Sequence, residues 1–109
     1  MKTQNRVQLI GYLGNDPEIR TTPSGAQYAK IRMATDEYFK DGSGNAQRIT
    51  TWHDVVAWDC MAATVSGNYI KGSHVLIEGR ICHRTYEDKN GHLRYVTEIK
   101  ATNLINLDR

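Results

Sequence analysis

The chain is poor in cysteine, nearly balanced in charge and free of long hydrophobic runs, and each absence excludes a class of protein. Its only cysteines, Cys60 and Cys82, lack the spacing of a zinc site and allow at most one disulfide. The apolar stretches fall far short of the ~18 residues that span a bilayer, and no signal-peptide pattern is present. We therefore expect a cytoplasmic protein with reduced thiols, without a membrane segment, a metal or a cofactor.

The mild charge excludes a simple polycationic protein. The net charge is +2 over 109 residues, and the sequence pI is near 8.6, whereas a duplex-binding domain usually has a pI above about 9. An anionic ligand would have to be met by locally grouped cations. The length fits one domain over residues 1–109, which is large enough to bury a core.

The chain does contain five segments in which apolar and polar residues alternate. This alternation predicts strands over about residues 7–13, 28–33, 49–58, 75–86 and 93–106. Asp59 is expected to cap a helix of about two turns between the third and fourth strands, with Met61 and Val65 facing the core. Gly11 and Gly79 lie in mid-strand, which is typical of a sharply bent strand. This order predicts an all-β fold, a five-stranded OB-fold barrel with one short helix between strands 3 and 4. An SH3-like barrel or a small sandwich is the alternative, although neither calls for a helix at that point.

Two tryptophans stand on the side of the third strand that should face solvent. Side chains of a strand alternate between its faces, and Ile49, Val55 and Ala57 mark the core side. Trp52 and Trp58 then lie on the opposite face, together with Arg48, Thr50 and Asp54. Exposed aromatic rings suit flat ligands such as nucleic-acid bases, whereas a second element covering this face would simply bury them. The strand alone leaves both interpretations open.

Aromatic residues and cations recur together on the predicted outer faces of three strands. They are Tyr28, Lys30 and Arg32 in the second strand, Arg48, Trp52 and Trp58 in the third, and Arg80, Arg84 and Tyr86 in the fourth. Stacking contributes ~1–3 kcal/mol per base, while cations follow the phosphates. A duplex hides its base faces, so the pattern favours a single-stranded nucleic acid.

Other aromatic residues are expected to be structural. Tyr12, Tyr69 and Tyr95 are interpreted as packing residues, because an aromatic body with a solvated hydroxyl is ordinary barrel composition. His53 lies on the core side of its strand, which indicates a hydrogen-bonded histidine that is buried or interfacial.

A series of short motifs resembles the bacterial single-stranded DNA-binding proteins. The motifs include Asn5-Arg6-Val7, Leu9-Ile10-Gly11, Asp16-Pro17-Glu18, Trp52-His53, Tyr69-Ile70-Lys71-Gly72-Ser73 and Ile77-Glu78-Gly79. The match runs from about residue 4 to residue 106, in order and without large gaps. One such motif would be weak, but the series is specific.

The resemblance implies an OB-fold subunit of a homotetramer that binds single-stranded DNA without sequence preference. Such proteins protect single strands in replication, recombination and repair, in the bacterial cytoplasm at the nucleoid. The base-stacking aromatics of the family would fall on Phe39, Trp52, Trp58 and Tyr86, and its phosphate-contacting cations on Arg20, Lys40, Lys71, Arg84 and Arg94. The family histidine associated with subunit contact would be His53.

The chain also departs from the family pattern. Cys60 and Cys82 stand where basic residues often occur, which predicts a somewhat weaker phosphate track. The sequence stops at Asp108-Arg109 without the flexible linker and acidic tip that recruit replication and repair enzymes, so we do not expect such recruitment. The alternative function is a primosomal or RNA-binding OB-fold accessory protein. An enzyme is not expected, because no nucleophile–base pair, metal constellation or Gly-rich phosphate loop is evident.

Overall fold

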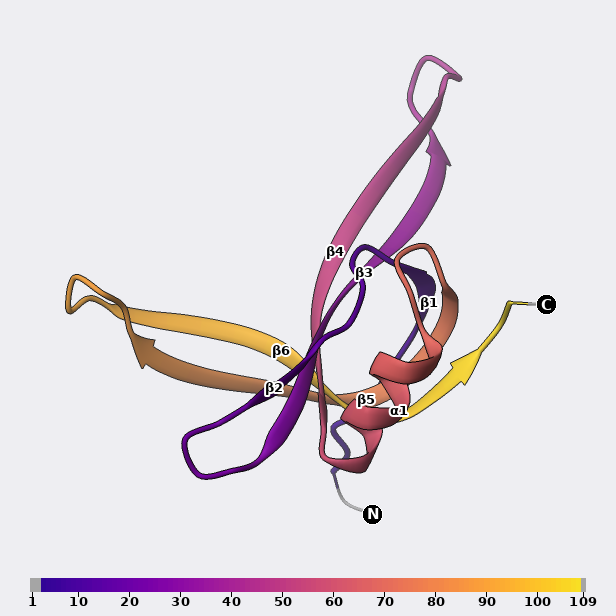
Figure 1. Ribbon diagram of the computed structural model, residues 1–109. Coiled ribbons are helices and arrows are strands. Elements are labelled where there is room, and N and C mark those ends of the chain that lie inside the picture. Colours follow the sequence, from indigo (N-terminus) through magenta and orange to yellow (C-terminus); the bar gives the residue numbers. More distant parts are fainter. Residues whose placement is uncertain (1–2, 109) are drawn as a thin grey trace.

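A computed structural model describes residues 3–108 and contains six strands and one helix (Figure 1). The strands are β1 (Val7–Leu13), β2 (Ile19–Thr21), β3 (Gln27–Lys40), β4 (Ala46–Trp58), β5 (His74–Glu87) and β6 (Leu93–Asn106), and the helix is α1 (Cys60–Asn68). All five predicted strands and the helix are present. The short strand β2 was not predicted.

Five of the strands close into a barrel. Their order around it is β1–β5–β6–β4–β3, and pairing between β3 and β1 closes the ring. The neighbours are antiparallel except β4 and β6, which run parallel. Strand β2 pairs only with the beginning of β3 and lies outside the ring. With α1 between β4 and β5, this is the predicted OB-fold barrel.

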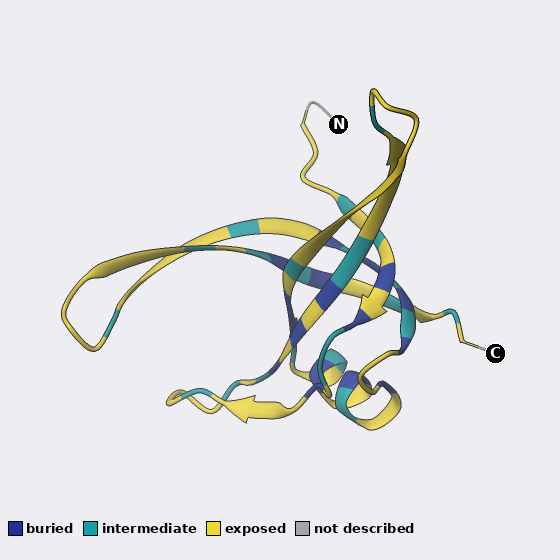
Figure 2. Cartoon of the chain, turned by 90° about the horizontal axis from the view of Figure 1, so that it is seen from above, coloured by how far each residue is buried: buried dark blue, intermediate teal, exposed yellow. Residues whose placement is uncertain are grey.

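Two hairpins extend beyond the barrel as arms. We call residues 34–52 the β3–β4 arm and residues 82–98 the β5–β6 arm, and Figure 1 shows that they diverge from the barrel in different directions. The radius of gyration is 16.2 Å, whereas a compact chain of this length would have about 13 Å. The arms therefore project into solvent, and Figure 2 shows them largely exposed.

The core is formed where the strands cross, from the side chains of one parity. Ile31, Met33, Val55 and Ile77 are among its fully buried members. The sequence also predicted Ile49 on this side, but Ile49 is 49% exposed. The prediction was wrong because this part of β4 belongs to the arm, which has no core beneath it.

Helix α1 lies against the barrel and buries Ala62 and Val65. Asp59 precedes it as predicted, but within the described chain its side chain makes no capping hydrogen bond, and its φ is 52°. Instead the Asp59 carbonyl accepts the Ala63 N–H at 3.2 Å. Within residues 3–108, no helix has the length and apolar character needed to cross a membrane.

The two mid-strand glycines lie where another backbone approaches closely. A Cβ atom at Gly11 would overlap the Ala34 carbonyl, and one at Gly79 would overlap the Lys100 carbonyl. The β5–β6 register also shifts between Glu78 and Gly79, as at a β-bulge. These strand crossings leave no room for a side chain.

Candidate nucleic-acid interface

Strand pairing joins the outer faces of four strands into one surface. Lys30 of β3 is opposite Val56 of β4, Val56 is opposite Lys100 of β6, and Lys100 is opposite Arg80 of β5. Paired residues lie on the same face of a sheet. A row that carries three cations therefore crosses the barrel at the base of the two arms.

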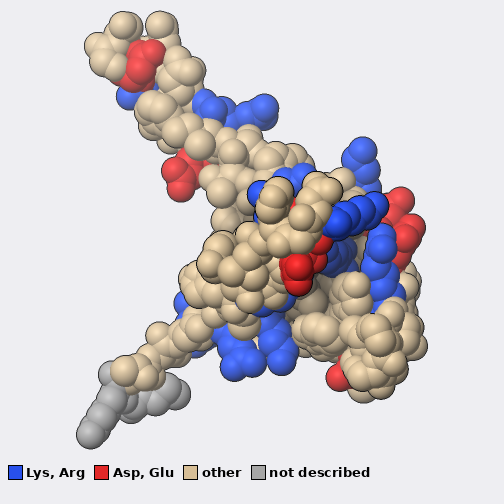
Figure 3. Space-filling view, turned by 90° about the vertical axis from the view of Figure 1, so that its left-hand side faces the viewer, with Lys and Arg blue, Asp and Glu red and all other residues tan. Residues whose placement is uncertain are grey.

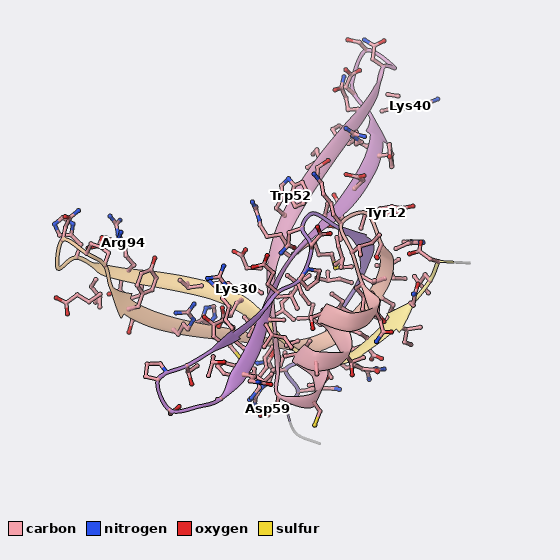
Figure 4. The ribbon with its side chains drawn as sticks, in the orientation of Figure 1. Tyr12, Lys30, Lys40, Trp52, Asp59 and Arg94 are labelled. Atoms are coloured by element: carbon pink, nitrogen blue, oxygen red, sulfur yellow. The ribbon has the colours of Figure 1, made fainter. Side chains whose placement is uncertain are left out.

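A groove of about 290 Å³ lies on this surface. Its lining combines apolar, basic and acidic side chains, among them Lys30, Arg32, Asp54, Val56, Val96 and Glu98. Figure 4 shows Lys30 between the two arms, Trp52 on the β3–β4 hairpin and Arg94 on the β5–β6 arm. Lys30 and Arg32, both predicted on the outer face of β3, are thus brought together with Asp54 of β4 and Glu98 of β6.

Trp52 stands at the base of the β3–β4 arm and is 50% exposed. The Arg32 guanidinium lies over its ring, 5.1 Å from the centroid. The Gly14 backbone approaches the same ring so closely that a Cβ atom there would lie 2.5 Å from Cζ3 of Trp52. The interpretation that a second element simply buries this residue is therefore wrong for Trp52.

Trp58 is more enclosed than Trp52. It is half-buried, and its ring lies 5.2 Å from that of Tyr28, with 42° between the planes. Both residues are on the outer face at the other end of the β3–β4 ladder. Tyr28 thus covers part of the Trp58 ring, so the two tryptophans are not equally open to a ligand.

Tyr86 lies near the tip of the β5–β6 arm, one residue before the end of β5. Its ring is exposed, and the Arg84 guanidinium lies 5.7 Å from the ring centroid. Arg84 donates a hydrogen bond through Nε to Oε1 of Glu98 at 3.0 Å. Arg94, opposite Tyr86 in the ladder, is held by Asp88, whose Oδ2 accepts its Nε–H at 2.8 Å. Rings and cations therefore alternate along this arm too.

The outer part of the β3–β4 arm is less simply arranged. Phe39 is exposed, but its ladder position opposite Gln47 has the parity opposite to that of Trp52, whereas Tyr38 and Arg48 share the parity of Trp52. Lys40 points away from the angle between the arms in Figure 4. Two-stranded ribbons twist strongly, so parity at the barrel does not fix the direction of a side chain near the tip.

Of the predicted cations, Lys30 and Arg32 line the groove, and the others, Arg20, Lys40, Arg48, Lys71, Arg80, Arg84 and Arg94, lie outside its lining. Arg20 is exposed on β2, opposite Tyr28. Lys71 is exposed in the loop between α1 and β5, where its backbone N–H donates to Oδ1 of Asp16 at 2.7 Å. The groove is formed without these two cations.

An aspartate braces the tip of each arm. Backbone N–H groups of Asn45 and Ser43 donate to Asp41, and these bonds lower the pKa of Asp41. At the other tip, bonds from the His92 N–H and the Arg94 guanidinium lower the pKa of Asp88. Both carboxylates are therefore stabilised in the charged form.

His53 lines a second cavity, which shares Asp54 and Glu98 with the groove. Its Nε2 lies 2.9 Å from Oγ1 of Thr35, and it is half-buried. The cavity measures about 330 Å³ and is mainly apolar, with Val7, Leu9, Ile81 and the Trp52 ring in its lining. The predicted hydrogen bond is present, and a contact with a partner subunit stays a prediction.

Two tyrosines expected to pack are exposed. Tyr12 is 52% exposed and stacks on His74, with centroids 4.6 Å apart and planes 14° apart, and Tyr95 is 77% exposed. Tyr69 is buried as predicted, and burial raises its pKa. The outward parity of Tyr12 beside Arg6 and Gln8 was a usable signal for its exposure.

The cysteines and acidic groups do not form a metal site in the part of the chain described. Both Cys60 and Cys82 are free thiols. Within residues 3–108, no three His, Cys, Asp or Glu side chains gather in a way that could hold an ion. The sequence placed Asp54 on the outer face with Trp52 but indicated no role for it, and Glu98, the second acid of the groove, was not predicted.

The closed barrel, with a groove that contains cations and with exposed aromatic rings on both hairpins, defines the class as an OB-fold binding protein. Residues 4–107 match the Single-strand binding protein family. The chain belongs to this family.

Individual relatives agree with this assignment. Single-stranded DNA-binding protein 1 of Chlorobaculum tepidum is 48% identical over 101 residues, which are 92% of this chain and 62% of that protein. This chain thus spans less than two thirds of that relative. A Plasmodium falciparum SSB in complex with ssDNA is similar with a TM-score of 0.84 and 29% identity, over 99% of this chain and 98% of that one. A deletion mutant of the single-stranded DNA binding protein from Thermus aquaticus gives 0.82 and 27%, over 96% and 51%.

Proposed function

We propose that this protein binds single-stranded DNA without sequence preference and without catalysis. The observation that carries the proposal is the half-exposed Trp52 ring beside the cation-lined groove between the arms. A flat ring binds any base through its face, and neighbouring cations bind the phosphates. Family membership and the similarity to an SSB in complex with ssDNA support the same function. Its role would be to protect single strands in replication, recombination and repair.

Tryptophan fluorescence during titration with oligo-dT tests this proposal directly. We expect the emission to change on binding, and the affinity to fall as salt displaces the protein from the phosphates. Unchanged emission together with no binding at low salt would overturn the proposal. A U oligomer of equal length, bound more tightly than dT, would instead indicate an RNA-binding accessory protein, because the 2′-hydroxyl distinguishes the two.

We also infer that the chain assembles with copies of itself, as the homotetramer that the family resemblance implies. Ile10, Leu76 and Ile105 form one row across the outer faces of β1, β5 and β6, and both isoleucines are exposed. One edge of β1 pairs with β5. In the described chain, the other edge pairs with β3 only at Tyr12 and Leu13, so the rest of that edge is unpaired. An apolar row and an open strand edge are both suited to pairing with a second copy.

A further inference from the structure

Each of the two hairpins, β3–β4 and β5–β6, carries an acid, an arginine and an aromatic ring in contact, and the acid of each lines the groove. In the β3–β4 triad, the Arg32 guanidinium lies over the Trp52 ring, and its Nε lies 3.8 Å from Oδ1 of Asp54. In the β5–β6 triad, the acid is Glu98, the arginine is Arg84 and the ring is that of Tyr86. The same chemistry therefore occurs twice, on strands from two different hairpins.

The two carboxylates are unexpected in a groove for a polyanion. An ionised carboxylate only accepts hydrogen bonds, so it offers nothing to a phosphate and repels it. Asp54 and Glu98 both line the groove, and their side chains are 63% and 12% exposed. Figure 3 shows acidic side chains among the Lys and Arg side chains on the side from which the β5–β6 arm projects. The groove is thus partly neutralised by the protein itself.

We propose that Asp54 and Glu98 compete with DNA phosphates for Arg32 and Arg84. This inference rests on the proposed function and describes how the same groove is regulated. In the free protein each arginine is paired with its acid and lies over its ring. A nucleotide that stacks on the ring displaces the guanidinium, and its phosphate takes the place of the carboxylate. The two acids therefore set the affinity below what the cations of the groove would otherwise provide.

Asp54→Asn and Glu98→Gln test the competition while preserving side-chain shape. Because exposed ion pairs contribute little, we expect each variant to bind labelled oligo-dT about 1.5- to fivefold more tightly, measured by fluorescence anisotropy at low salt. An arginine that becomes free for one more phosphate also steepens the dependence of log K on log salt by about 0.7. Asp54→Asn carries the test, because its exposed side chain is not needed for packing.

Matched controls separate local pairing from overall charge. Glu37→Gln and Glu87→Gln raise the net charge by the same amount on the same two hairpins. Glu37 is opposite Ile49 and Glu87 is opposite Leu93, so neither has the ladder parity of the triads. We expect both controls to change the affinity and the salt slope less than the triad variants do. An equal effect of Glu37→Gln and Asp54→Asn would overturn the inference.

A double-mutant cycle with Arg32→Gln identifies the partner of Asp54. If Asp54 acts by occupying Arg32, the gain from Asp54→Asn disappears in the Arg32→Gln background. A gain that persists there, or an Asp54→Asn variant that binds no more tightly than the wild type, contradicts the competition. Wild-type protein that fails to bind oligo-dT at all would instead overturn the proposed function, so the two failures are distinguishable.

Discussion

The Trp52 side chain is the residue on which base stacking can be tested most directly. Trp52→Ala removes a ring that is open to solvent at the groove, so we expect a loss of about 1–3 kcal/mol, or roughly five- to 140-fold in affinity. The salt slope should stay nearly unchanged, because stacking displaces no counterions. Anisotropy of labelled oligo-dT measures both quantities without using tryptophan emission. Tyr95→Ala is the matched control, since Tyr95 is exposed on a ladder position of opposite parity to Tyr86 and Arg94. A slope that collapses together with the affinity would contradict this division between stacking and charge.

At this scale, the period-two pattern predicted the side chains near the barrel better than those on the arms. It placed Trp52 and Arg32 on one outer face, where they are in contact. It failed for Ile49, because alternation assumes that one face packs on a core, and the arm has none. It also could not show that Arg32 lies over the Trp52 ring, since that depends on pairing between two strands. The contact between Tyr28 and Trp58 could not be predicted either, because it also depends on pairing between two strands.

At the scale of the elements, a methyl group placed at the close crossing of β5 and β6 tests how much this crossing contributes to stability. Gly79→Ala would push a Cβ atom into the Lys100 carbonyl, which is backbone and cannot move away cheaply. We expect a loss of about 1–3 kcal/mol in the free energy of unfolding, as for other overpacked sites. Chemical denaturation followed by circular dichroism measures it. Gly42→Ala, in the β3–β4 turn, meets no atom within 4 Å and serves as the control. Gly42→Ala reduces the conformational freedom of the unfolded chain, so it should raise the free energy of unfolding by about 0.4–1 kcal/mol. Equal stability of the two variants would contradict this prediction, because it would mean that the crossing has room for a methyl group at residue 79.

The elements that the sequence predicted well are those whose packing imposes a repeating pattern. Strands of the barrel alternate because one face is buried, and the Asp88-Lys89-Asn90-Gly91 turn marks the β5–β6 tip. Strand β3 was predicted to end near Met33 but continues to Lys40. Beyond the barrel both faces of this hairpin are exposed to solvent, so apolar and polar residues do not alternate there and the strand leaves no pattern in the sequence. Strand β2 has only three residues and exists because it pairs with β3, which no local pattern reveals.

At the scale of the whole molecule, the outer face of β1, β5 and β6 is the surface that we propose for contact between copies of the chain. Introducing one charge on this face tests the proposal. Ile10 lies in the middle of β1, in one row with Leu76 and Ile105. If this row packs on a second copy, Ile10→Lys would bury a charge in the contact, and the ammonium groups of two copies could meet. We expect the mass measured by light scattering to fall to that of a smaller species.

Ile70→Lys is the control for this prediction, because Ile70 is exposed in the loop between α1 and β5, away from the row. It introduces the same charge and should leave the mass unchanged. The groove lies on a different surface, so the smaller species formed by Ile10→Lys should still bind a short oligo-dT. If Ile10→Lys keeps the wild-type mass while remaining folded by circular dichroism, the copies meet elsewhere, and the open edge of β1 beside His53 becomes the surface to test.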